Sequence, residues 1–273
     1  MTRRKFLKCS AFTALGTAAG FGYGRLEAQW LGVTRVTLTV PNLPAPFKGK
    51  TVAFLADFHH GPFVPLSYIR KSVDMTMALR PDLIILGGDY PHDGVQFIDP
   101  CVQEVSKLSA PLGVYSVLGN HDHYRGGQPI VSAALRAARI PELTNRGLWI
   151  EADGARFWLC GVDDYWMGKQ RLSAALGPAT ASDAVILLSH NPDYVEKIHD
   201  PRVGLVLSGH THGGQVVLPF MGAPIVPSLY GQKYAQGLVQ GPVTKVFVTR
   251  GIGTVTPNIR LNCPPEIVLA TLA

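Results

Sequence analysis

Residues 51–59 read TVAFLADFH, a short aliphatic run that ends directly in an aspartate and a histidine. Four to six apolar residues in succession are typical of a strand that is covered on both faces of its sheet. The same texture recurs in four further runs, which are DLIILG (82–87), GVYSVL (113–118), AVILLS (184–189) and VGLVLS (203–208). These runs predict the central strands of the fold.

Helical and antiparallel segments lie between and around these runs. Helical patterns occupy 65–79, 97–108, 130–138 and 192–198, the last of them after Asn191, which is placed as an N-cap. Residues 148–152 and 156–160 flank Asp153-Gly154, a strong hairpin signal. Further strands are expected at 33–40, 245–249 and 266–272. This order predicts an α/β (α+β) protein with two packed mixed β-sheets flanked by helices.

Composition and charge narrow the classes of function. The chain has 273 residues, 47% of them hydrophobic, which suffices for a large core without disulfides. The net charge is +6, but residues 1–28 hold five basic groups and one acidic group, so residues 29–273 carry only +2. Without a basic tract there, we expect no nucleic-acid binding. The four cysteines form no CxxC pair, and we expect those in the body to be free buried thiols.

The first 28 residues have the layout of an export signal. Arg3-Arg4 is followed by KFLK and an uncharged run from Cys9 to Gly24, and this resembles a twin-arginine (Tat) leader. Residues 26–28 (LEA) make a poor cleavage site, so residues 1–28 predict either a Tat-type signal or an uncleaved anchor. Residues 29–273 predict one domain. The Tat translocase is then the expected partner during export. The expected location is periplasmic or extracytoplasmic, either free or anchored to the membrane.

Polar side chains follow each of the five buried runs. Open α/β sheets bind ligands just beyond the carboxyl ends of their strands. The blocks at these ends are DFH (57–59), GGD (87–89), GNHD (119–122), HN (190–191) and GHTH (209–212). One such block alone is more often a cap or a structural histidine. Five together favour a metal site, because clustered imidazoles and carboxylates are poorly compensated without a cation.

In this order the blocks resemble the signature of the calcineurin-like metallophosphoesterases. The leader, the GHTHGGQ form of the last block, and the tail segments RGIGT (250–254) and NCPPE (262–266) resemble its bacterial Tat-exported phosphodiesterase branch (YkuE-like). The resemblance implies a four-layer αββα sandwich and an exported dinuclear metal-dependent phosphoesterase. It implies hydrolysis of a phosphodiester or pyrophosphate bond by metal-hydroxide attack, with a lipid-linked substrate such as UDP-diacylglucosamine as one candidate.

The resemblance also assigns roles to individual residues. It implies one metal held by Asp57, His59 and His212, a second held by Asn120, His190 and His210, and Asp89 as the bridge between them. The metals are two divalent ions from Mn, Fe, Zn and Co, with manganese the first choice.

Further residues beside the blocks receive roles outside the ligand set. His121 is the expected general acid, and Asp122 would orient it or pair with it. Arg250 is expected either to bind a substrate phosphate or to form a surface salt bridge. For His60, His92 and His123 we keep two alternatives, which are support of the site or substrate and a solvated loop position.

Two questions stay open in the sequence. The apolar, proline-containing segment 216–229 is either a lid packed on its own core or an exposed patch that contacts a bilayer or an acyl chain. The alternatives to a phosphoesterase are a binding or scaffold protein without turnover and a metal-dependent amide hydrolase. The complete ligand set and a bridging Asp89 favour phosphoryl chemistry on a phosphate-ester substrate.

Overall fold

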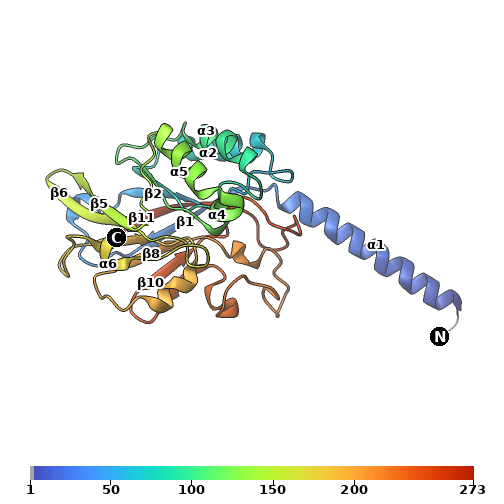
Figure 1. Cartoon of the computed structure of the whole chain (residues 1–273). Coiled ribbons are helices and arrows are strands. Elements are labelled where there is room, and N and C mark those ends of the chain that lie inside the picture. Colours follow the sequence, from blue (N-terminus) through green and yellow to red (C-terminus); the bar gives the residue numbers. More distant parts are fainter. Residues whose placement is uncertain (1–2) are drawn as a thin grey trace.

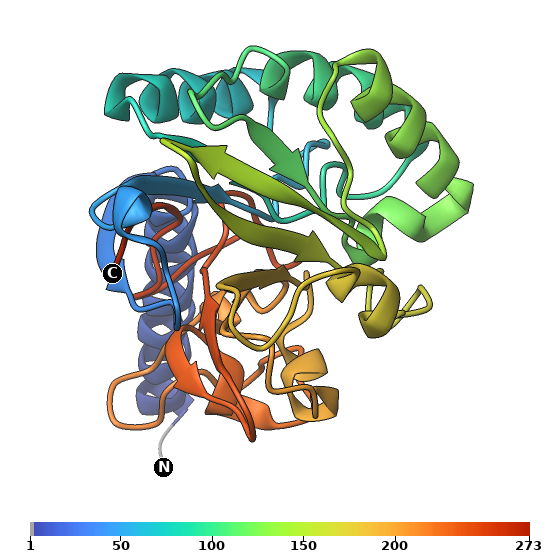
Figure 2. The ribbon, with the colours of Figure 1, turned by 90° about the vertical axis from the view of Figure 1, so that its left-hand side faces the viewer.

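The computed structural model describes residues 3–273, which form two mixed β-sheets packed face to face with helices outside them (Figures 1 and 2). Met1 and Thr2 lie outside the described residues, as do the side chains of residues 4, 6–9, 11–15 and 17. Most of the predicted twin-arginine segment and the Cys9 thiol belong to that set. The predicted fold class, two packed mixed sheets flanked by helices, is confirmed.

The first sheet has five strands in the order β1-β11-β2-β3-β4. They are β1 (Gly32–Leu38), β11 (Glu266–Leu272), β2 (Thr51–Leu55), β3 (Leu83–Leu86) and β4 (Val114–Ser116). Strand β11 runs antiparallel to β2, whereas β2, β3 and β4 are parallel to one another. Its outer face is covered by α2 (Leu66–Leu79), α3 (Ile98–Val105) and α5 (Gln128–Ala137). The short helix α4 (Asn120–His123) follows β4.

The second sheet has six strands in the order β5-β6-β7-β8-β10-β9. They are β5 (Arg146–Ala152), β6 (Ala155–Gly161), β7 (Val185–Leu188), β8 (Leu205–Ser208), β10 (Lys245–Val248) and β9 (Gly237–Gln240). Helix α6 (Leu172–Leu176) and a 3₁₀ helix at Pro192–Lys197 cover its outer face. The expected helix at 192–198 is therefore a 3₁₀ helix, capped as predicted by the Asn191 side chain, which accepts from the Asp193 amide at 2.9 Å. Edge strand β9 has a half-exposed pattern and was not predicted.

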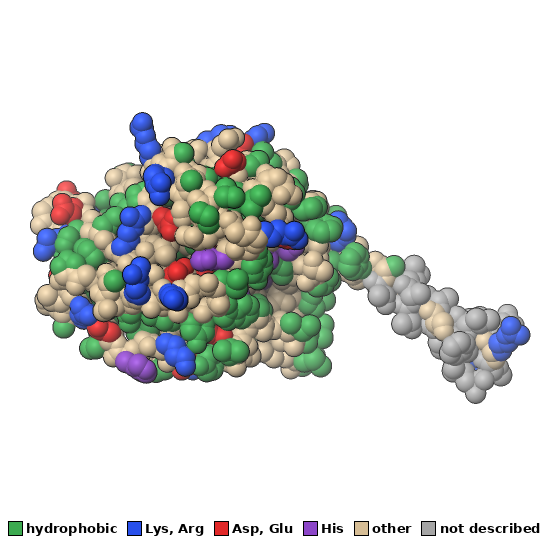
Figure 3. Space-filling model, in the orientation of Figure 1, with side chains coloured by type: hydrophobic (Ala, Val, Ile, Leu, Met, Phe, Trp, Pro, Cys, Tyr) green, Lys and Arg blue, Asp and Glu red, His purple; other side chains and the backbone are tan. Residues whose placement is uncertain are grey.

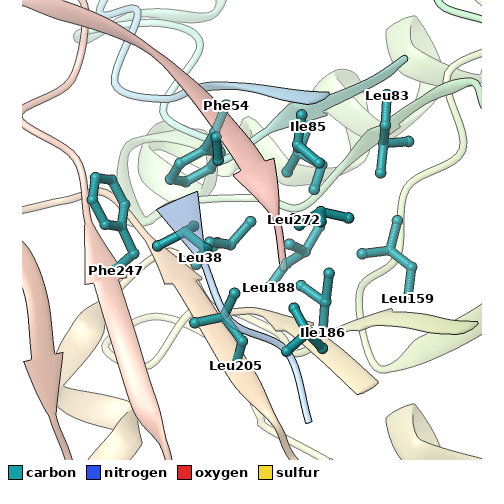
Figure 4. Close-up of a cluster of buried hydrophobic side chains, with 14 of the residues drawn as sticks. Leu38, Phe54, Leu83, Ile85, Leu159, Ile186, Leu188, Leu205, Phe247 and Leu272 are labelled. Atoms are coloured by element: carbon teal, nitrogen blue, oxygen red, sulfur yellow. The ribbon is translucent and has the colours of Figure 1, made fainter. Parts of the chain in front are cut away.

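The main core lies between the two sheets. Leu83 and Ile85 of β3 point into it, and Ile84 and Leu86 point the other way, toward the helices. Figure 4 shows the meeting of the two inner faces, with Phe54, Ile85 and Leu272 from one sheet and Ile186, Leu205 and Phe247 from the other. Because both faces of β3 are buried, its sequence is apolar without alternation. Burial of each such side chain stabilises the fold by about 1.5–3 kcal/mol.

Helix α1 (Arg3–Glu27) projects from the body and touches it only near its end (Figure 1). The Gly24 carbonyl accepts from the Arg260 amide at 2.9 Å, and the buried Glu27 carboxylate accepts from the Cys263 amide at 2.7 Å. No helix within residues 3–273 combines the length and apolar character needed to cross a bilayer. As predicted for the body, Cys101, Cys160 and Cys263 are buried and free.

Candidate metal centre

Strands β2, β3 and β4 of one sheet and β7 and β8 of the other deliver their polar blocks to one place. The turns after them are bent in a way that L-residues rarely adopt. Positive φ angles occur at Asp57 (58°), His59 (48°), Asp89 (59°), His210 (72°) and His212 (53°). Such backbone costs about 1–3 kcal/mol per residue and persists only where the surroundings impose it. The chain thus holds five of the predicted ligands in strained turns.

A glycine next to the cluster keeps space for it. A Cβ at Gly119 would lie 2.2 Å from Asp89 Oδ1 and 2.7 Å from His190 Cε1. Those distances are far below van der Waals contact, so any side chain there would displace one of the two groups. This explains why the GNHD block opens with glycine.

The first predicted ligand group is present as a cluster. His59 Nε2 and His212 Nε2 face each other at 2.9 Å. Asp57 Oδ1 lies 3.6 Å from His212 Nε2 and 3.9 Å from His59 Nε2. The His210 amide donates to Asp57 at 2.9 Å and so holds the carboxylate in this position. Two ring nitrogens and a carboxylate that converge on one point form a typical donor set for a divalent cation.

The second predicted group lies beside the first, with Asp89 between them. Asp89 Oδ2 is 3.5 Å from His59 Nε2 and 3.2 Å from His190 Nε2. His190 Nδ1 donates to the Gly87 carbonyl at 2.7 Å, which leaves Nε2 as the nitrogen that faces Asp89. Asp89 therefore contacts one histidine of each group, which is the position of a bridging ligand.

Asn120 and His210 complete the second group. Asn120 Oδ1 lies 2.8 Å from His210 Nδ1. The Asn120 amide nitrogen donates to the Tyr124 hydroxyl at 3.0 Å, and this orients the amide so that its oxygen faces the cluster. All seven residues predicted as ligands are thus brought together by the fold.

The electrostatics of the cluster suit a bound cation. Burial lowers the pKa of His59 and His212 well below the ordinary value, and that of His210 to about 3, so these rings are neutral as metal ligands must be. Burial raises the pKa of Asp57 to about 6. Burial opposes the charge on His190, but the Asp89 carboxylate outweighs it and raises the pKa of His190 well above its usual range. The Asp89 carboxylate thus attracts positive charge to this point, which a divalent metal would supply in place of a proton on His190.

His121 lies beside the cluster without joining either ligand group. Its amide donates to Asp89 Oδ1 at 2.8 Å, and its ring lies perpendicular to the His59 ring with 4.5 Å between centroids. Its Nδ1 is hydrogen-bonded to the backbone carbonyl of His92. The His92 carbonyl therefore orients the ring, and Nε2 is the atom free to transfer a proton.

The predicted pairing of Asp122 with His121 is wrong. The fully buried Asp122 carboxylate accepts from three backbone amides, those of Asp89 (2.8 Å), Tyr90 (2.9 Å) and Gly119 (2.8 Å). Burial and the charge of Asp89 raise the pKa of Asp122 to about 7, against the effect of these donors. Both oxygens are occupied by backbone, so Asp122 joins the turns after β3 and β4 and does not touch the reacting groups.

Arg250 forms a salt bridge behind the last ligand turn. Its guanidinium pairs with Glu266 at 2.6 Å and donates to the Thr34 hydroxyl at 3.2 Å, which joins the turn after β10 to β11 and β1. A Cβ at Gly213 would meet the Arg250 side chain at 3.0 Å, so the stem packs behind the last ligand turn. Of the two alternatives in the sequence, the salt bridge is the one formed.

Arg260 supports the centre and was missed in the sequence. Its fully buried guanidinium donates to the carbonyls of Gly253 (2.6 Å), Arg250 (2.7 Å), Cys263 (3.1 Å) and His212 (3.3 Å). No carboxylate among residues 3–273 forms an ion pair with it. Its partners are backbone carbonyls from distant turns, and no sequence pattern marks such a role.

A sixth strand end was also missed. Residues 162–170 follow β6, and Trp166 of this loop lies against His210 with 4.3 Å between ring centroids. Asp163 and Asp164 stand where the other blocks place their polar residues, so the same strand-end pattern would have found this loop.

The three neighbouring histidines all contact other groups of the fold. His60 Nδ1 contacts the Val64 carbonyl at 2.9 Å, and the His123 ring lies 3.3 Å from the Asp163 carboxylate. The His92 ring contacts those of His59 and His121, which also contact each other. All three therefore support the loops of the centre, which is the first of the two alternatives in the sequence.

The segment 216–229 is an exposed patch. Its most exposed apolar residues are Phe220 (110%), Ile225 (79%), Leu229 (73%) and Met221 (63%). Figure 3 shows hydrophobic side chains on the side of the molecule from which α1 projects. A lid packed on its own core would bury these four side chains, so that alternative is wrong for them.

The chain is similar in sequence to a known family of phosphoesterases. Residues 50–214 match the calcineurin-like phosphoesterase family. The chain is 35% identical to phosphodiesterase YaeI of Escherichia coli (strain K12), over 100% of this chain and 99% of that protein. It is 33% identical to the uncharacterized metallophosphoesterase YkuE of Bacillus subtilis (strain 168), over 100% and 98% of the two chains. An uncharacterized metallophosphoesterase of Aquifex aeolicus (strain VF5) is 31% identical, over 92% and 95%.

Proposed function

The chain belongs to the calcineurin-like phosphoesterase family and is a metal-dependent phosphoesterase, and we propose that it hydrolyses a phosphodiester or pyrophosphate bond at this centre. The observation that carries the proposal is the position of Asp89 Oδ2, 3.5 Å from His59 Nε2 and 3.2 Å from His190 Nε2, between two donor groups. All seven ligand positions and His121 are retained, which speaks against a scaffold without turnover.

The residues would hold two divalent cations, one near Asp57, His59 and His212 and one near Asn120, His190 and His210, with Asp89 between. When bound, such cations offset the negative charge of phosphate oxygens and lower the pKa of water. Nitrogen and oxygen donors without cysteine suit several first-row ions, and we propose manganese as the native one.

The chain itself supplies the proton for the leaving group. The His92 carbonyl holds Nδ1 of His121, so that Nε2 is the ring nitrogen left to transfer a proton. The amide of His121 is hydrogen-bonded to Asp89, which holds the ring beside the ligand cluster. A positioned general acid of this kind contributes about 10²- to 10⁴-fold.

We further propose that the substrate is a lipid-linked phosphate such as UDP-diacylglucosamine, and that segment 216–229 contacts a bilayer or an acyl chain. The exposed Phe220, Met221, Ile225 and Leu229 support this, because soluble proteins rarely leave contiguous apolar side chains in water. The proposed Tat export to the periplasm rests on the leader. Burial of Gly24 and Glu27 in the domain supports a leader that stays attached as an anchor.

The test combines metal analysis with a substrate panel. The full chain is assayed with bis(p-nitrophenyl) phosphate, with p-nitrophenyl phosphate and with UDP-diacylglucosamine in mixed micelles, before and after chelation and with Mn²⁺ restored. We expect about two metal ions per chain, hydrolysis of the diester and the pyrophosphate, and loss of both on chelation. Hydrolysis limited to the monoester would contradict the proposal.

A further inference from the structure

The loop after β6 is held by side-chain hydrogen bonds although it has no regular secondary structure. The Asp164 carboxylate accepts from the amides of Trp166 (2.9 Å) and Met167 (2.8 Å). The Asp163 carboxylate accepts from the amides of Asp164 (3.0 Å) and Lys169 (2.9 Å). Side-chain carboxylates thus replace the backbone partners that a helix or sheet would provide.

The same loop is tied to its surroundings on both sides. Asn145, just before β5, accepts from the Arg171 amide at 2.7 Å and donates to the Lys169 carbonyl at 2.8 Å. On the other side, His123 lies 3.3 Å from the Asp163 carboxylate. The loop is therefore preorganised relative to the metal centre, because His123 follows the GNHD block directly.

Trp166 is held at the mouth of the centre by this network. Its ring stands perpendicular to that of His210, whose Nδ1 contacts Asn120 Oδ1 at 2.8 Å. Yet 44% of the side chain is exposed, and its neighbour Met167 is 49% exposed. The indole N–H donates to no other residue within 3–273. The hydrogen bonds that shape the loop involve carboxylates and backbone rather than the indole, so the loop holds the ring and not the reverse.

His121 and Trp166 lie at different ligand groups of the centre, and this decides which part of a substrate each can contact. His121, which supplies the proton to the leaving oxygen, packs against His59 of the first ligand group. Trp166 packs against His210 of the second group. A group bonded to the phosphate and lying near Trp166 is therefore the one that stays on the phosphate, not the one that leaves.

We propose that Trp166 determines specificity by stacking on a planar ring, aryl or nucleobase, carried by the retained ester group. The inference rests on the proposed function and names the substrate class of the same site. An exposed indole that is already immobilised loses little entropy on stacking. Stacking of a base on an aromatic side chain is worth enough to change binding by tenfold or more on truncation.

The test uses two diesters with one leaving group. Bis(p-nitrophenyl) phosphate retains a planar ring after hydrolysis, whereas methyl p-nitrophenyl phosphate retains only a methyl group. For Trp166→Ala we expect kcat/KM for the aryl diester to fall about tenfold, mainly through KM, and that for the methyl diester to change less than about twofold. Trp166→Phe should restore most of the loss, because a phenyl ring also stacks.

Controls separate the possible outcomes. Trp30→Ala removes an exposed tryptophan at the base of α1 and should leave both substrates unchanged. Metal content of Trp166→Ala should equal that of the wild type. Equal losses on both diesters, or no loss on either, would overturn the inference. If the metal-loaded wild type hydrolyses neither diester, it is the proposed function that fails.

Discussion

The two ends of strand β3 carry similar residues in opposite situations. At the amino end, Asp82 accepts from the Thr51 amide (2.8 Å), the Thr51 hydroxyl (2.9 Å) and the Lys50 ammonium (3.1 Å). At the carboxyl end, Asp89 is 1% exposed, and its Oδ2 faces the ring nitrogens of His59 and His190. The Asp82 carboxylate is neutralised and hydrogen-bonded by Lys50 and Thr51, whereas Asp89 Oδ2 faces ring nitrogens at a site suited to a cation.

Strand β3 therefore serves two purposes. For Asp82, burial raises the pKa, but the donors from Thr51 and Lys50 outweigh it and hold the pKa below its usual value. For Asp89, burial has the same direction, and the charges of His190 and His121 hold the pKa well below its usual range. The amino end contributes to stability, and the carboxyl end assembles a site from groups that have no better partner.

Removal of the Asp89 carboxylate should cause the greatest loss of activity. Asp89→Asn should lower kcat/KM by at least about 10³-fold and reduce metal content, since metal charge contributes several kcal/mol of barrier lowering. The matched control is Asp82→Asn, the same change at the other end of β3, which should keep full metal content and activity. Metal analysis and diester hydrolysis measure both variants. Full activity in Asp89→Asn would remove the distinction between the two ends.

The next effect is loss of the proton donor. His121→Ala should slow turnover by about 10²- to 10⁴-fold at unchanged metal content, because its ring belongs to neither ligand group. His199→Ala, at an exposed histidine away from the centre, serves as the control. An emptied metal site in His121→Ala would assign this histidine to the ligands instead.

A smaller effect, on stability, is expected from removal of the buried Arg260 guanidinium. Arg260→Ala should lower the free energy of unfolding by about 3 kcal/mol, because several buried carbonyls lose their donor and a cavity remains. Arg202→Ala, at a partly exposed arginine paired with Asp200, should lose about 1 kcal/mol or less. Denaturant titration measures both. Equal losses of stability in the two variants would mean that the buried hydrogen bonds of Arg260 contribute no more than a surface salt bridge.

The smallest effect is the pH dependence of the amino end. The folded pKa of Asp82 is lowered, so its stabilisation is complete above its unfolded pKa near 4 and is lost as the pH falls below that value. Asp82→Asn should therefore be less stable than the wild type by under about 1 kcal/mol at pH 7. The difference should shrink as the pH falls through the lowered folded pKa of Asp82. A difference that grows toward acid pH would contradict the assignment.

Much of the fold and of the centre was predictable for a local reason. The apolar runs at 51–56 and 82–87 and the blocks that follow them are adjacent in sequence, so strand and site can be read together. Asn191 as a cap and the Asp153-Gly154 hairpin depend on neighbours within a few residues as well. The pairing of Asp122 with His121 was predicted wrongly because two of its three partners, the amides of Asp89 and Tyr90, come from another turn. The salt bridge of Arg250 depends in the same way on Glu266, which lies on another strand.

The two-sheet architecture, the seven candidate ligands and the family could all be predicted from sequence patterns. Periodicity, turn residues and short motifs are properties of consecutive residues, and they need no knowledge of the packing. Three further roles become visible only in the folded chain: Arg260 holds the last turn, the His92 carbonyl orients His121, and Trp166 lies beside His210 of the centre. These roles depend on which donor or ring the fold brings within contact distance, and that is set by the packing of both sheets together.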